Sequence, residues 1–290
     1  MHATDVCFHT PFGKVAGLSW QDPQQTDQPV ILALHGWLDN AATFSQLAPV
    51  LSQKYHVIAI DLPGHGHSDW LAGGGDYYIW EAVSWVAEVI RQLAGPVHLL
   101  GHSMGAATSI ISASAYPDLV RSVVLLDAAG PLSTPADQAP EQLRKGIDDA
   151  IRRAKAGSRL KVYGNTEAAL AARIRQDPSL SPECIAPVVE RNLEAVAGGV
   201  QWCTDPRLRH TSKLRMTEDL VQSFMAAVEC PVRILKAAQT FIPASFFEMR
   251  LGYLKTAQLQ ELPGHHHFHL EPETATAVAN DVLDFYQGIH

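Results

Sequence analysis

The stretch Val97–Tyr116, VHLLGHSMGAATSIISASAY, decides how the chain folds. Its apolar start, Val97–Leu100, has the composition of a buried strand, and the small residues at its end are compatible with a helix. Between them, residues 101–105 (GHSMG) fit the pattern Gly-x-Ser-x-Gly, in which a serine occupies a sharp turn from strand to helix. We therefore expect Ser103 to lie above the edge of a sheet as a nucleophile. The alternative is a tight turn with a bystander serine.

Apolar runs without polar alternation recur along the chain and predict strands buried on both faces, as in a parallel sheet. These runs are Val30–Leu34, Val57–Ile60, Val97–Leu100, Val123–Leu126, Val232–Ala237 and Ala257–Leu262. Val6–His9 and Lys14–Trp20 have the pattern of an antiparallel hairpin. Three further segments have the pattern of helices: Thr43–Gln53, Ile79–Leu93 and Pro272–Tyr286. The order predicts an α/β fold with a mostly parallel central sheet flanked by helices.

This alternation stops near Gly130-Pro131. Residues 132–228 are polar, rich in arginine and helical in pattern, and we find no clear strand among them. We therefore expect residues 1–131 and 229–290 to form one core domain. Residues 132–228 should form a helical cap that lies over Ser103 with an apolar inner face.

Composition narrows the range of partners. The chain has 290 residues, 47% of them hydrophobic and 18% charged, as in soluble globular enzymes. A net charge of −8 and the absence of a basic run argue against nucleic acid, and no apolar run is long enough for membrane insertion. Cys7, Cys184, Cys203 and Cys230 are scattered without metal spacing, which favours a reduced, cytoplasmic setting.

A serine nucleophile in acyl transfer needs hydrogen-bond donors for the oxyanion. The segment 34–37 (LHGW) directly follows the strand expected at Val30–Leu34, and its glycine lets the backbone turn close to Ser103. The backbone N–H groups of Trp37 and Met104 are the natural pair for an oxyanion hole. An ordinary turn at the end of a strand is the alternative.

The general base should be a histidine late in the chain. Residues 262–272 (LPGHHHFHLEP) offer His265, His266, His267 and His269. We expect no metal site here, because His267 and His269 would point in opposite directions in an extended segment and few acidic ligands are nearby. We interpret the loop 61–68 (DLPGHGHS) as scaffolding for the rim of the site.

Taken together, these motifs resemble the α/β-hydrolase superfamily over nearly the whole chain. The resemblance is close in 35–41 (HGWLDNA), in 61–68, in 101–105 and in 263–272. Residues 35–41, together with 202–208 (WCTDPRL), are similar to the family of serine hydrolase-like proteins. In the superfamily the base often lies five residues before a glutamate that begins the last helix. That spacing from Glu271 implies His266 as the base.

The chain departs from the superfamily at the triad acid. Members usually carry an acid after the strand that corresponds to Val232–Ala237, but Gln239 and Thr240 follow that strand here. A minority of members place the acid after the preceding strand, and this implies Asp127. Two alternatives are that Asp127 only caps a turn and, more distantly, that Glu248 is the acid.

The order Ser103…Asp127…His266 fits a hydrolase triad. We expect a serine hydrolase that cleaves a small apolar carboxylic ester through an acyl-serine intermediate, with no metal or organic cofactor. The serine argues against dehalogenases and epoxide hydrolases, whose nucleophile is an aspartate. A lactone or C–C bond hydrolase on the same triad is the first alternative. A ligand-binding protein with little turnover is the second, because no acid follows Val232–Ala237.

Overall fold

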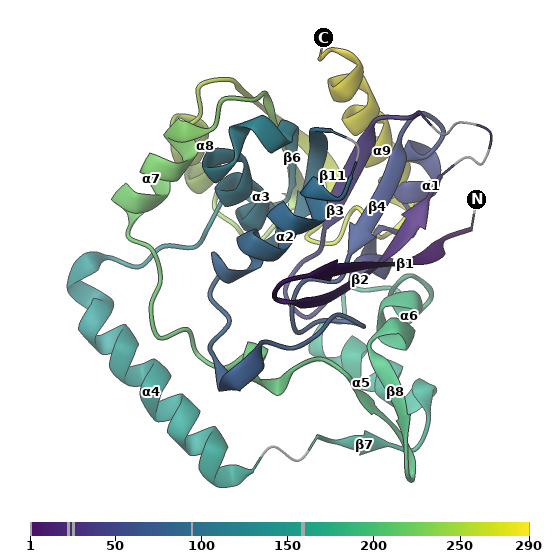
Figure 1. The fold of residues 1–290 in the computed structure, drawn as a ribbon, viewed down its shortest axis with the longest axis vertical. Coiled ribbons are helices and arrows are strands. Elements are labelled where there is room, and N and C mark those ends of the chain that lie inside the picture. The colour runs from purple at the N-terminus through teal and green to yellow at the C-terminus, as the bar shows by residue number, and fades with distance from the viewer. Residues whose placement is uncertain (1, 22–23, 25–26, 94, 158–159, 290) are drawn as a thin grey trace.

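The protein is described by a computed structural model that covers residues 2–21, 24, 27–93, 95–157 and 160–289 (Figure 1). Its core is an eight-stranded sheet in the order β1-β2-β4-β3-β5-β6-β10-β11. The strands are β1 Thr4–Thr10, β2 Gly13–Trp20, β3 Val30–Leu34, β4 His56–Ile60, β5 Val97–His102, β6 Val120–Leu126, β10 Val232–Gln239 and β11 Ala257–His265. The pairs β1–β2 and β2–β4 are antiparallel and the other pairs are parallel. The predicted fold class, all six apolar strands and the hairpin are confirmed.

Helices cover both faces of the sheet because each central strand is apolar on both sides. Along β3, Leu32 and Leu34 belong to one apolar cluster while Ile31 and Ala33 belong to another. The first cluster packs under α2 Glu81–Arg91, α3 Met104–Ala115, α7 Glu218–Ala227 and α8 Ala244–Leu251. The second packs under α1 Ala48–Leu51 and α9 Pro272–Gln287.

The helix expected at Thr43–Gln53 is divided in two. A short 3-10 helix covers Ala41–Phe44, and α1 begins separately at Ala48 with Pro49 in its first turn. Proline has no backbone N–H, so it is tolerated at the start of a helix but disfavoured in the interior. Among the described residues, no helix is long and apolar enough to cross a membrane.

Residues 132–228 contain more than helices. They include α4 Ala139–Ala156, α5 Thr166–Gln176, α6 Pro182–Arg191 and α7, but also an antiparallel sheet in the order β7-β9-β8. Its strands are β7 Val162–Tyr163, β8 Leu193–Val196 and β9 Gly199–Trp202. Our expectation of no strand in this segment was wrong, because strands of two to four residues are too short for a periodic pattern.

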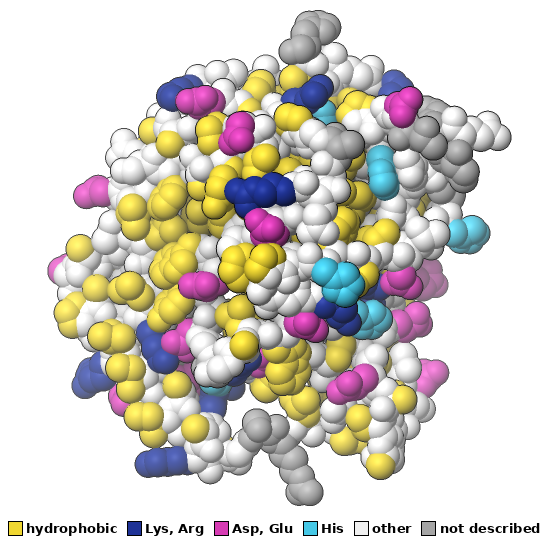
Figure 2. All heavy atoms as spheres, in the orientation of Figure 1, with side chains coloured by type: hydrophobic (Ala, Val, Ile, Leu, Met, Phe, Trp, Pro, Cys, Tyr) yellow, Lys and Arg dark blue, Asp and Glu magenta, His cyan; other side chains and the backbone are white. Residues whose placement is uncertain are grey.

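The two ends of this insertion pack differently. Val221 and Met225 of α7 lie in the same apolar cluster as α3, so this helix packs with the core although it precedes residue 228. Helix α4 instead runs along the outer side of the insertion in Figure 1. It carries three hydrophobic side chains, Leu143, Ile147 and Ile151, that are 44%, 41% and 48% exposed. Hydrophobic side chains are visible over this side of the molecule in Figure 2.

Candidate active site

Ser103 occupies the turn between β5 and α3. Its backbone has φ 51° and ψ −109°, a conformation that costs energy for a residue other than glycine and is frequent at functional sites. A Cβ atom on Gly101 would lie 2.5 Å from the backbone nitrogen of Ala106, and one on Gly105 would lie 2.0 Å from the Leu34 carbonyl oxygen. Both glycines are therefore required by close backbone packing, as the sequence pattern predicts.

Asp127 and His266 meet at the same edge of the sheet as Ser103. Strands β5 and β6 are adjacent, with His102 paired to Leu126, so Ser103 and Asp127 each follow a paired residue. The turn after β11 brings His266 to them, and its Nδ1 lies 2.7 Å from Oδ2 of Asp127. Since a carboxylate only accepts hydrogen bonds, His266 donates from Nδ1, and in the neutral tautomer with that proton Nε2 is the nitrogen with the lone pair.

Three groups hold the Asp127 carboxylate. It is fully buried, and its own backbone has φ 45°. Oδ1 accepts a 3.0 Å hydrogen bond from the backbone N–H of Ala237, and Oδ2 accepts a 2.7 Å bond from the hydroxyl of Thr240 as well as the bond from His266. Glu248, the distant alternative, is exposed, and in the described part of the chain the hydrogen bond and ion pair of the His266 ring go to Asp127 instead.

Sequence reasoning missed the role of Thr240. We read it only as a residue that stands where an acid is expected, yet its hydroxyl points at the acid that lies there instead. A hydroxyl at this position was the available signal. Its partner could not be known without the packing of β10 beside β6.

The hydroxyl of Ser103 makes no hydrogen bond to any described residue. Hydrogen bonds between a nucleophile and its base often tighten only when substrate binds. The phenyl ring of Phe241 lies 4.8 Å from the His266 ring, centroid to centroid, although its residue is 77% exposed. An aromatic side chain thus borders the imidazole on the solvent side.

The expected oxyanion donors also lie near this edge. Within the described ranges, the backbone N–H groups of Trp37 and Met104 have no hydrogen-bond partner. The indole of Trp37 is tied to the insertion by a 2.9 Å hydrogen bond from Nε1 to the Leu208 carbonyl oxygen. The turn at Trp37 is tight: Leu38 has φ 64°, and a Cβ atom on Gly36 would lie 2.8 Å from Nδ1 of His102.

The other histidines of the late cluster are not arranged as we expected. Residues 266–270 form a turn, not an extended segment. The rings of His267 and His269 therefore both lie against His102, with centroid distances of 5.1 Å and 4.1 Å. Our reason for discounting a ligand cluster, that these side chains diverge, was wrong. Burial and the neighbouring histidines lower the pKa of both His102 and His269 well below its ordinary value.

An acidic residue also lies in this cluster. Asp39 is buried and forms ion pairs with His267 at 3.5 Å and with Arg173 at 3.6 Å. Burial alone would raise the pKa of Asp39, but the hydrogen bond and charge of His267, together with the charge of Arg173, hold it well below its ordinary value. The sequence placed Asp39 in the loop after β3, far from the histidines that it meets.

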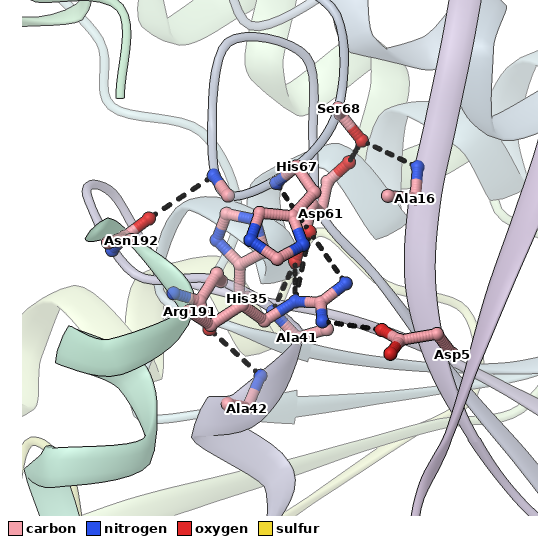
Figure 3. Close-up of polar contacts among 12 residues, drawn as sticks. Asp5, Ala16, His35, Ala41, Ala42, Asp61, His67, Ser68, Arg191 and Asn192 are labelled. Atoms are coloured by element: carbon pink, nitrogen blue, oxygen red, sulfur yellow. Dashed lines mark hydrogen bonds and ion pairs between the residues drawn. The ribbon is translucent and has the colours of Figure 1, made fainter. Parts of the chain in front are cut away.

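The loop 61–68 anchors the insertion to the core, as its interpretation as scaffolding predicts (Figure 3). Asp61 is completely buried and pairs with Arg191, the last residue of α6, at 2.9 Å. The same carboxylate accepts hydrogen bonds from the backbone N–H groups of Ala41 and His67, at 2.8 Å and 2.9 Å. One buried charge therefore holds the loop after β3, the loop after β4 and α6 together.

Comparisons with known proteins agree with this architecture. A family model described as alpha/beta hydrolase fold matches residues 29–213. A serine hydrolase-like protein of Dictyostelium discoideum is 31% identical over 97% of this chain and 81% of its own length. A 2-(acetamidomethylene)succinate hydrolase of Mesorhizobium japonicum is also 31% identical, over 88% of each chain.

Solved structures are similar over nearly the full length. A hypothetical protein of Pseudomonas aeruginosa has a TM-score of 0.89 and 36% identity over 98% of this chain and 99% of its own. A thioesterase domain from the curacin biosynthetic pathway has a TM-score of 0.82 at 22% identity, covering 98% and 100% of the two chains, and shows the fold alone. By its sequence and by its sheet, the chain belongs to the α/β-hydrolase superfamily and has serine hydrolase-like proteins among its relatives.

Proposed function

We propose that this hydrolase cleaves a carboxylic ester through an acyl-Ser103 intermediate. The observation that carries the proposal is the 2.7 Å contact of His266 with the buried Asp127, at the sheet edge where Ser103 occupies a strained turn. In this proposal Nε2 of His266 takes the proton of the Ser103 hydroxyl as Oγ attacks the ester carbonyl. Asp127 orients the imidazole and stabilises the imidazolium that forms.

The N–H groups of Trp37 and Met104 then donate to the oxyanion of the tetrahedral intermediate. His266 returns its proton to the leaving alcohol, which completes the acyl-serine. Water then attacks the acyl-serine carbonyl while Nε2 of His266 takes its proton, and His266 gives that proton to Ser103 Oγ as the acid leaves. No step requires a metal or an organic cofactor. Residues 132–228 supply the wall of the substrate site opposite the sheet, in keeping with the bond from Trp37 to Leu208.

A fluorophosphonate probe and a panel of p-nitrophenyl esters of varied acyl length test the proposal. The wild-type chain should be labelled at Ser103 and should hydrolyse at least one ester. Ser103→Ala should abolish labelling and lower kcat by about 10⁴-fold or more. Ester hydrolysis that survives Ser103→Ala at the wild-type rate would end the hypothesis.

The same labelling and ester panel can also test the two alternative functions. A lactone or a C–C bond could be cleaved on the same triad, and a relative is named for a succinate that carries an acetamidomethylene group, so lactones and such amides belong in the panel. The ligand-binding alternative rested on a missing acid after β10, and the contact of Asp127 with His266 favours the hydrolase proposal over it. The cytoplasmic location stays a prediction.

A further inference from the structure

Four of the buried polar atoms that lack a hydrogen-bond partner lie together beside His266. In the described part of the chain they are Oδ1 of Asp39 and the Nδ1 atoms of His102, His267 and His269. Such atoms are rare in native proteins, and each calls for a physical explanation. The hydrolase mechanism uses none of them.

His102 shows why a ligand is needed. Its Nε2 lies 2.9 Å from the carbonyl oxygen of His266, so Nε2 carries the proton and Nδ1 carries a lone pair. This residue is 1% exposed, and no donor reaches Nδ1. A Cβ atom on Gly36 would lie 2.8 Å from this Nδ1 and 3.5 Å from Oδ2 of Asp39, so both atoms border the same point of the backbone.

The three side chains have the spacing of a metal-ligand set. Asp39, His102 and His267 each offer one ligand atom, and these atoms lie within 4.8 Å of one another. Oδ2 of Asp39 and Nε2 of His267 are 3.5 Å apart. Ligands about 2.1 Å from a tetrahedral zinc ion are separated by about 3.4 Å, so the Asp39–His267 separation already fits and His102 has to move inward to complete the set.

Each of these side chains also has an outer contact of the kind that orients metal ligands. Nε2 of His102 donates to the His266 carbonyl. Nδ1 of His267 lies 3.7 Å from a carboxylate oxygen of Asp177, and Oδ1 of Asp39 lies 3.6 Å from the guanidinium of Arg173. The set therefore combines ligand atoms on the inside with polar groups behind them.

We propose that Asp39, His102 and His267 bind one divalent transition-metal ion, and that the bound ion inhibits hydrolysis. Two imidazole nitrogens and one carboxylate favour zinc, cobalt or nickel over magnesium, with water completing the coordination. Inhibition follows from position, because the His266 ring lies 4.7 Å from that of His102 and 5.3 Å from that of His267. The ion draws His102 and His267 toward it, and both are tied to His266: Nε2 of His102 donates to the His266 carbonyl oxygen, and His267 is the next residue in the chain. The His266 ring is thereby moved from its position beside Asp127.

Binding is measured first, without substrate, so that its outcome does not depend on the proposed ester chemistry. Zinc is titrated calorimetrically into the full chain, and cobalt binding is followed by its visible absorption. Cys7 and His9 are exposed and lie 3.9 Å apart, so the measurements use a Cys7→Ser, His9→Gln background that removes this second pair. We expect one equivalent of zinc to bind to the parent. Zinc should bind about 100-fold more weakly to Asp39→Asn and to His267→Gln, because each lacks one ligand.

His265→Gln is the matched control, since His265 belongs to the same cluster but faces Glu271 at 3.9 Å and is outside the ligand set. It should bind zinc like the parent. The proposal is overturned if zinc binds equally to the parent, Asp39→Asn and His267→Gln, or if it does not bind at all. Asp39 and His267 would then form a buried ion pair beside His102 and no metal site. If the variants do not fold, anomalous scattering from zinc-soaked crystals of the wild-type chain decides, because the peak lies among the three side chains or elsewhere.

Inhibition is measured separately with the best ester substrate. Zinc should lower kcat in the parent and in His265→Gln but leave the residual rate of His267→Gln unchanged. Zinc that binds to the three residues without lowering kcat would overturn the inhibitory part. A chain that binds zinc but hydrolyses no ester would count against the proposed function alone.

Discussion

At the scale of single residues, the proposed chemistry depends on one carboxylate. Asp127 is fully buried and is held by Ala237, Thr240 and His266. An asparagine in place of Asp127 could accept the hydrogen bond from His266 only when its amide oxygen faces the ring. As a neutral group it could not stabilise the imidazolium. Thr240, which stands where the superfamily usually has its acid, contributes a hydroxyl to that carboxylate.

Asp127→Asn should lower kcat for ester hydrolysis by about 10⁴-fold, because the amide misorients His266. Asp284→Asn, an exposed aspartate of α9, is the control and should retain the parent rate. Steady-state kinetics on the preferred ester provides the measurement. A fully active Asp127→Asn chain would eliminate Asp127 as the triad acid.

Thr240→Val should have a much smaller effect. The substitution removes one hydrogen bond to Oδ2 while Ala237 and His266 keep theirs, so kcat should fall about tenfold, the equivalent of one hydrogen bond to a charged group. Thr240→Ser, which restores the hydroxyl, should recover the rate. Loss of activity in Thr240→Ser would contradict this and show that the hydroxyl alone is not enough, because that variant lacks only the methyl group.

At the scale of elements, α3 and α6 pack against the edge of the sheet where the candidate active site lies. Helix α3 begins at Met104 directly after Ser103, and its first turn packs on the carbonyl of Leu34 at the end of β3. Helix α6 holds the insertion to the core through Arg191 and the buried Asp61. Both contacts are within close-packed regions, where the structure cannot relax cheaply.

Gly105→Ala should prevent the normal packing of α3. The added Cβ atom would lie 2.0 Å from the Leu34 oxygen, a distance that neither helix nor strand can accept without moving. Gly157→Ser, in open space at the end of α4, is a control for glycine replacement, although its φ of 80° makes some strain unavoidable. Thermal unfolding should show a large loss for Gly105→Ala and a small one for Gly157→Ser. A parent-like midpoint for Gly105→Ala contradicts the packing.

Arg191→Met should reduce the free energy of unfolding by about 3–5 kcal/mol, because it leaves the Asp61 carboxylate buried without its cation. Lys145→Met is the control, since the Lys145–Glu141 pair has side chains 61% and 56% exposed and is screened by solvent, so its loss should leave the free energy of unfolding nearly unchanged. Urea unfolding measures both. Equal losses in the two variants would mean that Asp61 finds another partner.

At the scale of the whole molecule, buried neutral histidines make stability depend on pH. Burial lowers the pKa of His65 to about 3 and that of His98 to about 4, from an ordinary value of 6.5. Below pH 6.5 the unfolded chain binds protons at these residues and the folded chain does not. The stabilisation is therefore complete above that value and is lost as the pH falls toward the folded-state pKa values.

We expect the free energy of unfolding to fall by about 1.4 kcal/mol per pH unit for each such histidine below about pH 6. Urea unfolding curves at pH values from about 7.5 down to about 5 test this. His98→Gln, which removes one titrating group beside Ser122, should give a shallower slope. Unchanged stability across this range would show that these side chains titrate alike in both states.

Local signals explain how much could be predicted. Strand β3 was predicted with its observed bounds, and the turn at Ser103 was recognised, because apolar runs and flanking glycines act over a few residues. The sheet β7-β9-β8 was missed because its strands are short. The turn at 266–270 was misread as extended, although backbone hydrogen bonds from Phe268 to His265 and from Leu270 to His267 close it locally. The 3.0 Å contact of His269 with Thr43, which fixes it against the core, could not be read from the segment itself.

The sequence by itself determined where along the chain the strands of the main sheet occur, the sharp turn at Ser103 and the family to which the chain belongs. The resemblance also implied that Asp127 pairs with His266, and the two side chains do meet across 139 residues. Only the tertiary structure decided that Thr240, 113 residues from Asp127, donates to its carboxylate. It also decided that Asp39 lies among the late histidines. The physical reason is range, since propensity and turn chemistry act between neighbours in the chain, whereas the partners of a buried charge are set by which strand edges the packed sheet brings together.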